Sequence, residues 1–126
     1  MNNNESMEMY LETVYILESD HGHAHVVDIA KSLGVSKPGV TKAIKHLKVQ
    51  GLVNMKKYGT ITLTEQGREL SEEIYSHHKL IELFLEHSLK LSSEQAGINA
   101  CKIEHILSNE MLDAIESYLK NNNIDV

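Results

Sequence analysis

The chain has 126 residues, of which 41% are hydrophobic and 24% are charged, and its formal net charge is −6. This length suits one compact core or two small units, and no apolar run approaches the roughly 20 residues needed to cross a bilayer. The polar start MNNNES lacks a basic and then apolar signal pattern, so we expect a cytoplasmic protein. The single cysteine excludes an internal disulfide.

Charge is distributed unevenly along the sequence. Residues 1–25 carry five acids and no Lys or Arg, residues 26–62 carry seven lysines and one aspartate, and residues 63–126 carry five basic and twelve acidic residues. The middle block therefore has a charge of +6 between blocks of −5 and −7. A basic block of this kind indicates a surface that binds an anionic partner.

The first half of the chain predicts three helices, because apolar residues recur there at helical spacing. Gly34 suits a turn that requires a positive φ, and Ser36 followed by Pro38 is typical of a helix start. The alternative for HGHAH, residues 21–25, is a metal site, but two histidines that are two positions apart on a loop seldom complete one. We therefore interpret this stretch as a surface loop. The predicted helices cover residues 6–19, 27–33 and 36 to about 49.

Residues 52–64, LVNMKKYGTITLT, change from helical spacing to short β patterns. They predict two strands, Leu52–Met55 and Ile61–Leu63, with KKYG between them as the tip of a hairpin. A long helix is then predicted over residues 64–89.

Two more helices are predicted near the C-terminus. Ser92 followed three residues later by Gln95 is typical of a capping box, and we expect this helix to continue through Leu107. A last helix begins at Ser108 or Asn109. We interpret its apolar face as a dimer surface; the alternative is that it lies in the chain's own core, and the two interpretations are compatible. This face consists of Met111, Leu112, Ile115 and Leu119.

The order helix, short helix, glycine turn, helix and hairpin is that of a winged helix-turn-helix. The helix after the turn presents hydroxyls and amines on its outer side, where they can contact base edges and phosphates in a major groove. The alternative is a solvated lysine-rich helix, and the charge segregation argues against it. The predicted DNA contacts are Ser36, Lys37, Pro38, Thr41, Lys42, Lys45, Lys57 and Tyr58.

Three of the predicted helices carry residue types that bind metals. The stretch ACKIEHIL contains Cys101, Glu104 and His105, and residues three and four apart on a helix share a face. The alternatives are a small buried cysteine and a solvated Glu–His pair. Converging helices would form a site of nitrogen, oxygen and sulfur donors for a first-row divalent metal. The two further pairs at such spacings are Met9 with Glu12 and His78 with Glu82.

With these motifs in place, the sequence resembles the diphtheria-toxin-repressor family of metal-dependent transcriptional regulators. The resemblance covers nearly the whole chain, from SMEMYLETVYIL to ACKIEHILS. It implies a mainly α fold, with a winged helix-turn-helix DNA-binding domain at residues 1–63 and a helical metal-binding and dimerisation domain at residues 64–126. Many members also have a C-terminal barrel-like domain, which we expect to be absent because this chain ends at Val126.

The resemblance also implies metal ligands. The iron-responsive branch uses a first-helix Met and a Cys-x-x-Glu-His, matched here by Met9, Cys101, Glu104 and His105. A second metal site in the family uses a His and a Glu four apart, which match His78 and Glu82. A further His of that site would fall near Gly97, where it is missing from the sequence.

The manganese-responsive branch differs at two of these positions and adds a third ligand. It uses carboxylates where Met9 and Cys101 stand, and a first-helix Glu that matches Glu12. The sequence therefore mixes the two ligand sets. Soft thioether and thiolate ligands suit iron(II) better than manganese(II), so we expect iron(II) first and manganese(II) next.

The expected function is that of a homodimeric repressor that binds operator DNA when it is loaded with a divalent metal. A metal that bridges the first helix and the dimerisation side would restrain the DNA-binding helices. One alternative is a zinc hydrolase built from His77, His78, Glu82 and His105, but the sequence has no HExxH, nucleophile elbow or phosphate loop. Another is a metal-free DNA-binding regulator that responds to an organic ligand.

Overall fold

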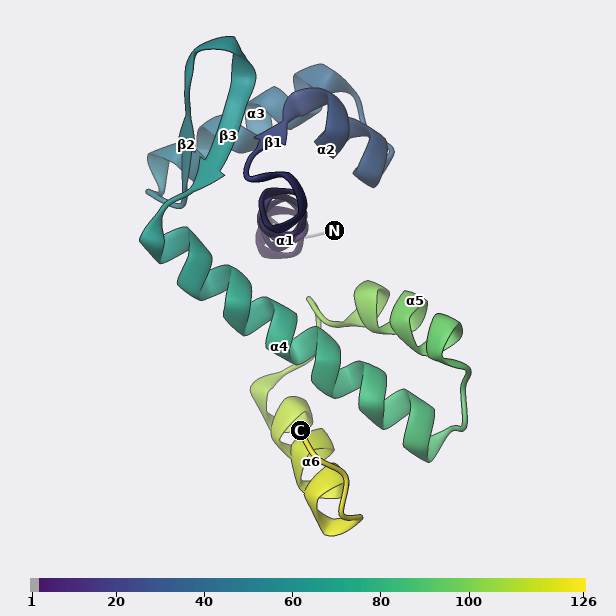
Figure 1. Cartoon of the computed structure of the whole chain (residues 1–126). Coiled ribbons are helices and arrows are strands. Elements are labelled where there is room, and N and C mark those ends of the chain that lie inside the picture. Colours follow the sequence, from purple (N-terminus) through teal and green to yellow (C-terminus); the bar gives the residue numbers. More distant parts are fainter. Residues whose placement is uncertain (1–2) are drawn as a thin grey trace. The chain divides into compact units, whose positions relative to one another are not determined.

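A computed structural model describes residues 3–126 of the chain, with side chains described from Ser6 onward. The described part divides into two compact units, Met1–Glu72 and Glu73–Val126, whose boundary lies within one long helix. Figure 1 shows the elements along the chain. In order, these are α1 (Asn3–His21), β1 (Ala24–His25), α2 (Val26–Leu33), α3 (Lys37–Val49), β2 (Val53–Met55), the 3-10 turn η1 (Lys57–Gly59), β3 (Thr60–Leu63), α4 (Glu65–Ser88), α5 (Ser93–Ile103) and α6 (Asn109–Asn121).

The first unit is a winged helix-turn-helix. Helices α1, α2 and α3 pack with a small antiparallel sheet of order β1-β3-β2, whose β2–β3 hairpin is the wing (Figure 1). Its core consists of apolar side chains that are each less than a tenth exposed. The largest of them are Leu11, Ile29, Ile44, Leu47 and Ile61. The fold class predicted from the helical and strand periodicities is therefore confirmed.

The turn between α2 and α3 has the predicted chemistry. Gly34 adopts a φ of 67°, in the left-handed region that favours glycine, and its backbone N–H donates to Ala30 O. The Ser36 hydroxyl oxygen then accepts a hydrogen bond of 3.2 Å from the Gly39 N–H and caps α3, with Pro38 in the first turn. These contacts set the direction of the helix that carries most of the predicted DNA contacts.

The prediction of a loop at HGHAH is wrong in part. His21 ends α1, Gly22 turns the chain with a φ of 84°, and Ala24–His25 forms strand β1, in which Ala24 pairs with Ile61 of β3. Ala24 is only 1% exposed, so the stretch contributes to the core of the unit. Alternation of polar and apolar residues is typical of a half-buried strand. A strand of only two residues is too short, however, to predict a partner 37 positions away in the sequence.

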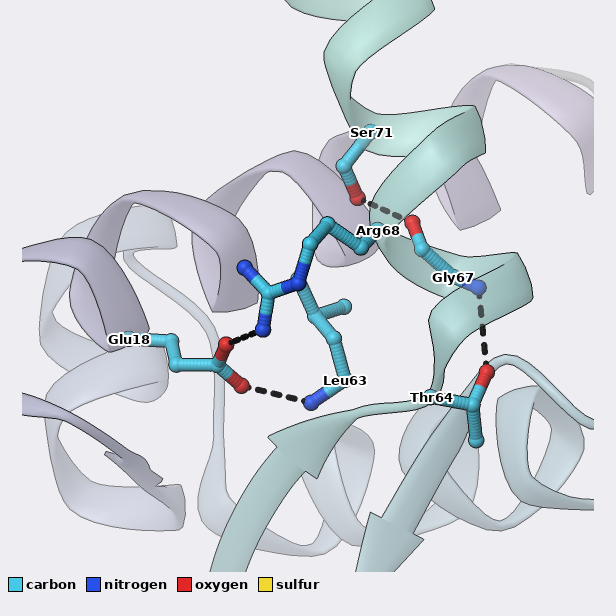
Figure 2. Close-up of polar contacts among 6 residues, drawn as sticks. All are labelled: Glu18, Leu63, Thr64, Gly67, Arg68 and Ser71. Carbon is cyan, nitrogen blue, oxygen red and sulfur yellow. Dashed lines mark hydrogen bonds and ion pairs between the residues drawn. The ribbon is translucent and has the colours of Figure 1, made fainter.

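A polar network ties the end of α1 to the end of β3 and the start of α4, all within the first unit (Figure 2). The Glu18 carboxylate accepts a hydrogen bond of 2.6 Å from the Leu63 N–H and forms an ion pair with Arg68. The hydrogen bond from Arg68 to Glu18, and then the negative charge of Glu18, raise the pKa of Arg68. Arg68 therefore keeps its charge at every physiological pH.

The first turns of α4 lie directly against the chain that follows α3. The Gly67 N–H donates to Thr64 Oγ1 over 3.0 Å, and Ser71 Oγ donates to Gly67 O over 2.7 Å (Figure 2). The Thr64 hydroxyl donates in turn to Gly51 O. A Cβ atom placed on Gly67 would lie 1.9 Å from Leu52 O, so the helix can approach this closely only because residue 67 has no side chain.

The second unit is helical. The later part of α4 packs with α5 and α6 around one apolar cluster, which the Ser92 and Ser108 caps of α5 and α6 help to position. None of the described helices is both long and apolar enough to cross a membrane. The buried residues of the cluster are Ile81, Leu85, Ala96, Ala100, Leu112, Ile115 and Leu119.

The predicted end of α5 and the predicted face of α6 both need correction. Helix α5 ends at Ile103, not at Leu107, because the chain tightens into a turn before Ser108 caps α6. On α6, three of the four apolar residues assigned to a dimer surface are core residues of their own unit, as the alternative had it. Met111, with 46% exposure, is the fourth and faces outward.

Candidate functional site

The predicted DNA contacts lie on one helix and on the wing of the first unit. Helix α3 buries Val40, Ile44 and Leu47 on one side, so the lysines between them face outward. Thr41 is partly exposed. The Ser36 oxygen is used for capping, and its hydroxyl hydrogen can still be donated to a phosphate. The exposed members of the predicted set are Ser36, Lys37, Pro38, Lys42, Lys45, Lys57 and Tyr58.

The tip of the wing has an unusual backbone at Tyr58. The Gly59 N–H donates to Lys56 O and closes the turn, and Tyr58 adopts a φ of 69°. A side chain in this left-handed region costs about 1–2 kcal/mol. The Tyr58 side chain is 96% exposed, so packing within the chain does not offset that cost. A strained, exposed ring directly after two lysines is the arrangement expected of a residue that contacts a partner.

The sequence-based prediction omitted one polar residue on this face. His46 is exposed on α3 four residues after Lys42, and the two line a hollow of about 240 Å³ together with Lys45 and Val49. The i, i+4 spacing from Lys42 was the available signal, but only lysines were considered as phosphate contacts.

The second unit brings four of the predicted metal ligands into direct contact. His78 Nδ1 lies 2.8 Å from Glu104 Oε2, and His105 Nε2 lies 3.1 Å from Glu104 Oε1. On its other side, His78 Nε2 lies 3.3 Å from Glu82 Oε2. These distances are those of hydrogen bonds or ion pairs, and they join the four side chains through successive pairwise contacts.

These four residues come from two elements and from the turn that follows α5. His78 and Glu82 are one turn apart on α4, so they share a face. Glu104 is the C-cap of α5, and His105 lies in the turn beyond it, so the prediction that both lie within one helix is wrong. The early end of α5 is what turns His105 toward the Glu104 carboxylate.

Burial makes Glu104 the centre of this cluster. The residue is 4% exposed, and its carboxylate lies between the imidazoles of His78 and His105. A buried carboxylate is stable only with compensating charge or hydrogen bonds. Because His78 has a different carboxylate at each ring nitrogen, one nitrogen can hold an ion while the other donates a hydrogen bond. Imidazole and carboxylate donors suit a first-row divalent ion.

The remaining predicted ligands are placed as follows. Cys101 lies on α5 and is exposed, so the alternative of a small buried cysteine is wrong. Met9 and Glu12 lie on α1 in the first unit, where Met9 is partly exposed and Glu12 is 6% exposed. Gly97 of α5 faces Glu82, since a Cβ atom there would lie 3.9 Å from Glu82 Oε1.

Family comparisons cover nearly all of the chain. Residues 4–61 match the family described as iron dependent repressor, N-terminal DNA binding domain. Residues 64–125 match the family described as iron dependent repressor, metal binding and dimerisation domain.

Individual relatives agree with these matches. An uncharacterized HTH-type transcriptional regulator of Methanocaldococcus jannaschii is 36% identical over 117 residues, which are 92% of this chain and 94% of the relative. The HTH-type transcriptional regulator MntR of Lysinibacillus sphaericus is 36% identical over 110 residues, 87% of this chain and 78% of the relative.

A solved structure has the same fold. The structure of the manganese regulator SloR matches with a TM-score of 0.76 and 29% identity, over 95% of this chain and 55% of that one. This chain thus spans about half the length of that structure. Taken with the two domain matches, these likenesses show that the chain belongs to the iron dependent repressor family, a family of transcriptional regulators and not of enzymes.

Proposed function

We propose that the chain is a metal-dependent transcriptional repressor that binds operator DNA as a homodimer and controls genes of metal homeostasis. The observation that carries the proposal is the contact of two imidazoles and two carboxylates in the unit that matches a metal-binding and dimerisation domain. We place the DNA-binding domain at residues 1–63 and the metal-binding and dimerisation domain at residues 64–126, in keeping with the two family matches.

The proposed ligand set combines this cluster with residues of α1 and α5. A bound divalent ion supplies positive charge that offsets the mutual repulsion of the carboxylates. Glu104 and His105 hold the centre in the second unit, and Met9 and Glu12 restrain α1 when they join it. That restraint shifts the population of conformers toward the one that binds DNA. The full set is Met9, Glu12, His78, Glu82, Cys101, Glu104 and His105.

DNA binding follows from the face described on α3 and the wing. Lys42 and Lys45 contact phosphates, and Ser36 and Thr41 supply hydroxyls to the major groove. A homodimer would place its two copies of α3 about 34 Å apart, one turn of B-DNA. The wing adds Lys57 and Tyr58 at the neighbouring backbone.

Iron(II) is the metal that we propose first, and manganese(II) is the second candidate. The thioether of Met9 and the thiol of Cys101 are soft donors and favour iron(II). The four donors in contact within the second unit are nitrogen and oxygen only, which manganese(II) also accepts. SloR, one of the similar proteins, is a manganese regulator, and this supports the second candidate.

The test is an anaerobic gel-shift experiment on genomic fragments with iron(II), manganese(II) or a chelator. We expect retarded fragments with metal and none with chelator, and a lower midpoint for iron(II) than for manganese(II). Glu104→Gln should abolish the metal response, because it removes the negative charge between the two imidazoles. Glu116→Gln, an exposed carboxylate of α6, is the matched control.

Two results would overturn parts of this proposal. DNA binding that persists in chelator, or that is unchanged by Glu104→Gln, would leave a metal-free regulator as the better description. A lower midpoint for manganese(II) would move the physiological metal to the second candidate and leave the repressor mechanism in place.

A further inference from the structure

Two histidine side chains lie in contact at edge strand β1 of the first unit, one in the strand and one just before it, and neither belongs to the proposed metal centre. Their ring centroids are 4.6 Å apart, and the ring planes meet at 82°. These are His23 and His25, which flank Ala24. Ala24 is 1% exposed and points into the core, and successive side chains of an extended chain point to opposite sides. The side chains of His23 and His25 therefore lie on the same side of the chain, opposite to Ala24.

The backbone holds this pair in place. His25 pairs with Thr60 of β3 and is also the residue from which α2 starts, so its position is fixed in two directions. Both histidines are partly buried. Side chains with restricted rotamers lose less entropy when they bind a common ligand.

The ring nitrogens of the pair are not used by the chain. Within residues 6–126, no hydrogen bond or ion pair engages either imidazole, and His25 does not cap α2 with its side chain. This distinguishes the pair from His78 and His105, whose nitrogens contact carboxylates. The two rings are in contact, and within residues 6–126 their nitrogens form no hydrogen bond or ion pair.

We propose that His23 and His25 form a two-histidine site for a late first-row divalent ion, namely zinc, nickel or copper. Imidazole nitrogen suits these ions, and the affinity of such donors rises along the series from manganese to copper. With two ligands from the protein, water occupies the remaining coordination positions of the ion. With no carboxylate in the pair, the site discriminates against manganese(II), in contrast to the carboxylate-containing centre of the second unit.

The position of the site gives it a consequence for the DNA-binding unit. A hollow of about 360 Å³ is lined by His25, Val27, Asp28 and Tyr58, so a charge bound at His25 lies in the same hollow as the wing tip. A bound ion would cross-link the segment that joins α1 to α2. Ligands that bind only the folded state stabilise it, so the first unit should melt at a higher temperature with nickel.

The experiment uses the full chain with His78→Gln and His105→Gln, which disables the centre in the second unit. Nickel(II) binding is then measured by calorimetric titration, with further substitutions at the pair. We expect His23→Gln and His25→Gln each to weaken nickel binding by about tenfold or more, since each converts a two-point contact into a single one. His21→Gln is the matched control, because His21 is exposed in the same stretch. It should leave the affinity unchanged.

A second readout does not depend on affinity. Copper(II) added at a small fraction of an equivalent should broaden the imidazole NMR signals of His23 and His25 together. The signals of His21, His46 and His87, which are exposed histidines, should broaden only at higher copper. Equal broadening of all five, or equal effects of the three Gln substitutions, would mean adventitious surface binding and would overturn the site. The result is independent of whether the chain represses transcription.

Discussion

The exposed fraction of each side chain separates residues that are available to a partner from residues that form the core. Helix α3 presents lysines on one side and buries aliphatic residues on the other, so one helix does both. Cys101 is exposed, although lone cysteines are usually among the most buried residues. Glu104 is a carboxylate and is buried. Both departures from the usual distribution fall on residues of the proposed metal set.

The lysines of α3 give a prediction on salt dependence. Lys45→Ala should weaken DNA binding and reduce the slope of log K against log salt by about 0.9, because each phosphate contact releases a counterion. Fluorescence anisotropy across a salt series measures this. Lys120→Ala, an exposed lysine of α6, should change neither quantity. Unchanged slopes for Lys45→Ala would show that α3 does not lie along the DNA backbone.

Cys101 gives a prediction that separates stability from metal response. Cys101→Ala should change the free energy of unfolding by less than about 0.5 kcal/mol, because the side chain is exposed. The same substitution should raise the iron(II) midpoint for operator binding. Replacing both sulfur residues, with Met9→Asp and Cys101→Glu, should move activation toward manganese(II). If both variants keep the wild-type metal order and midpoints, Cys101 is not a ligand.

At the scale of elements, the start of α4 is the most constrained junction that the structure describes. Glu18 reaches it from α1, and Thr64 and Ser71 form hydrogen bonds with Gly67 (Figure 2). The backbone of Leu52 also lies against Gly67. Helix α4 also carries His78 and Glu82 beyond this junction. These contacts hold the first turns of α4 against the rest of the first unit.

Glu18→Gln tests the ion pair at this junction. The amide oxygen can still accept the hydrogen bond from Leu63, but the charge that pairs with Arg68 is lost. The Arg68 side chain is 46% exposed, so solvent screening limits the expected loss of stability to about 1 kcal/mol. Glu116→Gln breaks a more exposed pair with Lys120 and should cost only a few tenths of a kcal/mol. Urea denaturation of both variants compares them, and equal effects would rule out a special role for Glu18.

Substitution of two helical glycines by alanine should change the free energy of unfolding in opposite directions. Gly67→Ala should destabilise the chain by about 2 kcal/mol or more, because its Cβ would lie 1.9 Å from a backbone oxygen. Gly97→Ala meets nothing closer than 3.9 Å and should stabilise α5 by about 0.5–1 kcal/mol through helix propensity. Thermal unfolding of the two variants is the measurement. A neutral Gly67→Ala would mean that α4 does not pack this closely.

At the scale of the whole molecule, the exposed apolar residues of α5 and α6 bear on assembly. The inner face of α6 is used within its own unit, so a second copy of the chain must contact other residues. In the proposed homodimer, large apolar side chains of the second unit that are more than a third exposed would provide that surface. They include Ile98, Ile106, Met111 and Tyr118.

We expect a homodimer in sedimentation experiments at tens of micromolar chain with metal present. Met111→Asp should shift it toward monomer, because a charge would enter an apolar interface without a partner. Val49→Asp, at an exposed apolar residue of α3 in the first unit, should leave the dimer intact. A monomer in wild type with metal would contradict the assembly proposed here.

The sequence determined the elements that depend on local chemistry. The helical period placed α1 to α4, the Gly34 turn and the Ser36, Ser92 and Ser108 caps were predicted from residue type, and the wing was predicted from a change of period. The segregation of lysines, read with the turn, indicated the DNA-binding face. These features can be predicted because residues close together in the sequence determine them.

Tertiary structure decided the features that depend on residues far apart in the sequence. Strand β1 exists because Ala24 pairs with Ile61, and the inner face of α6 became core because α4 and α5 supply its partners. Packing of α5 against α4 brings Glu104, which also contacts His105, to His78, and no spacing within one helix describes that contact. Periodicity indicates which side of a helix or strand is apolar. Which residues cover that side is determined only when segments far apart in the sequence pack together.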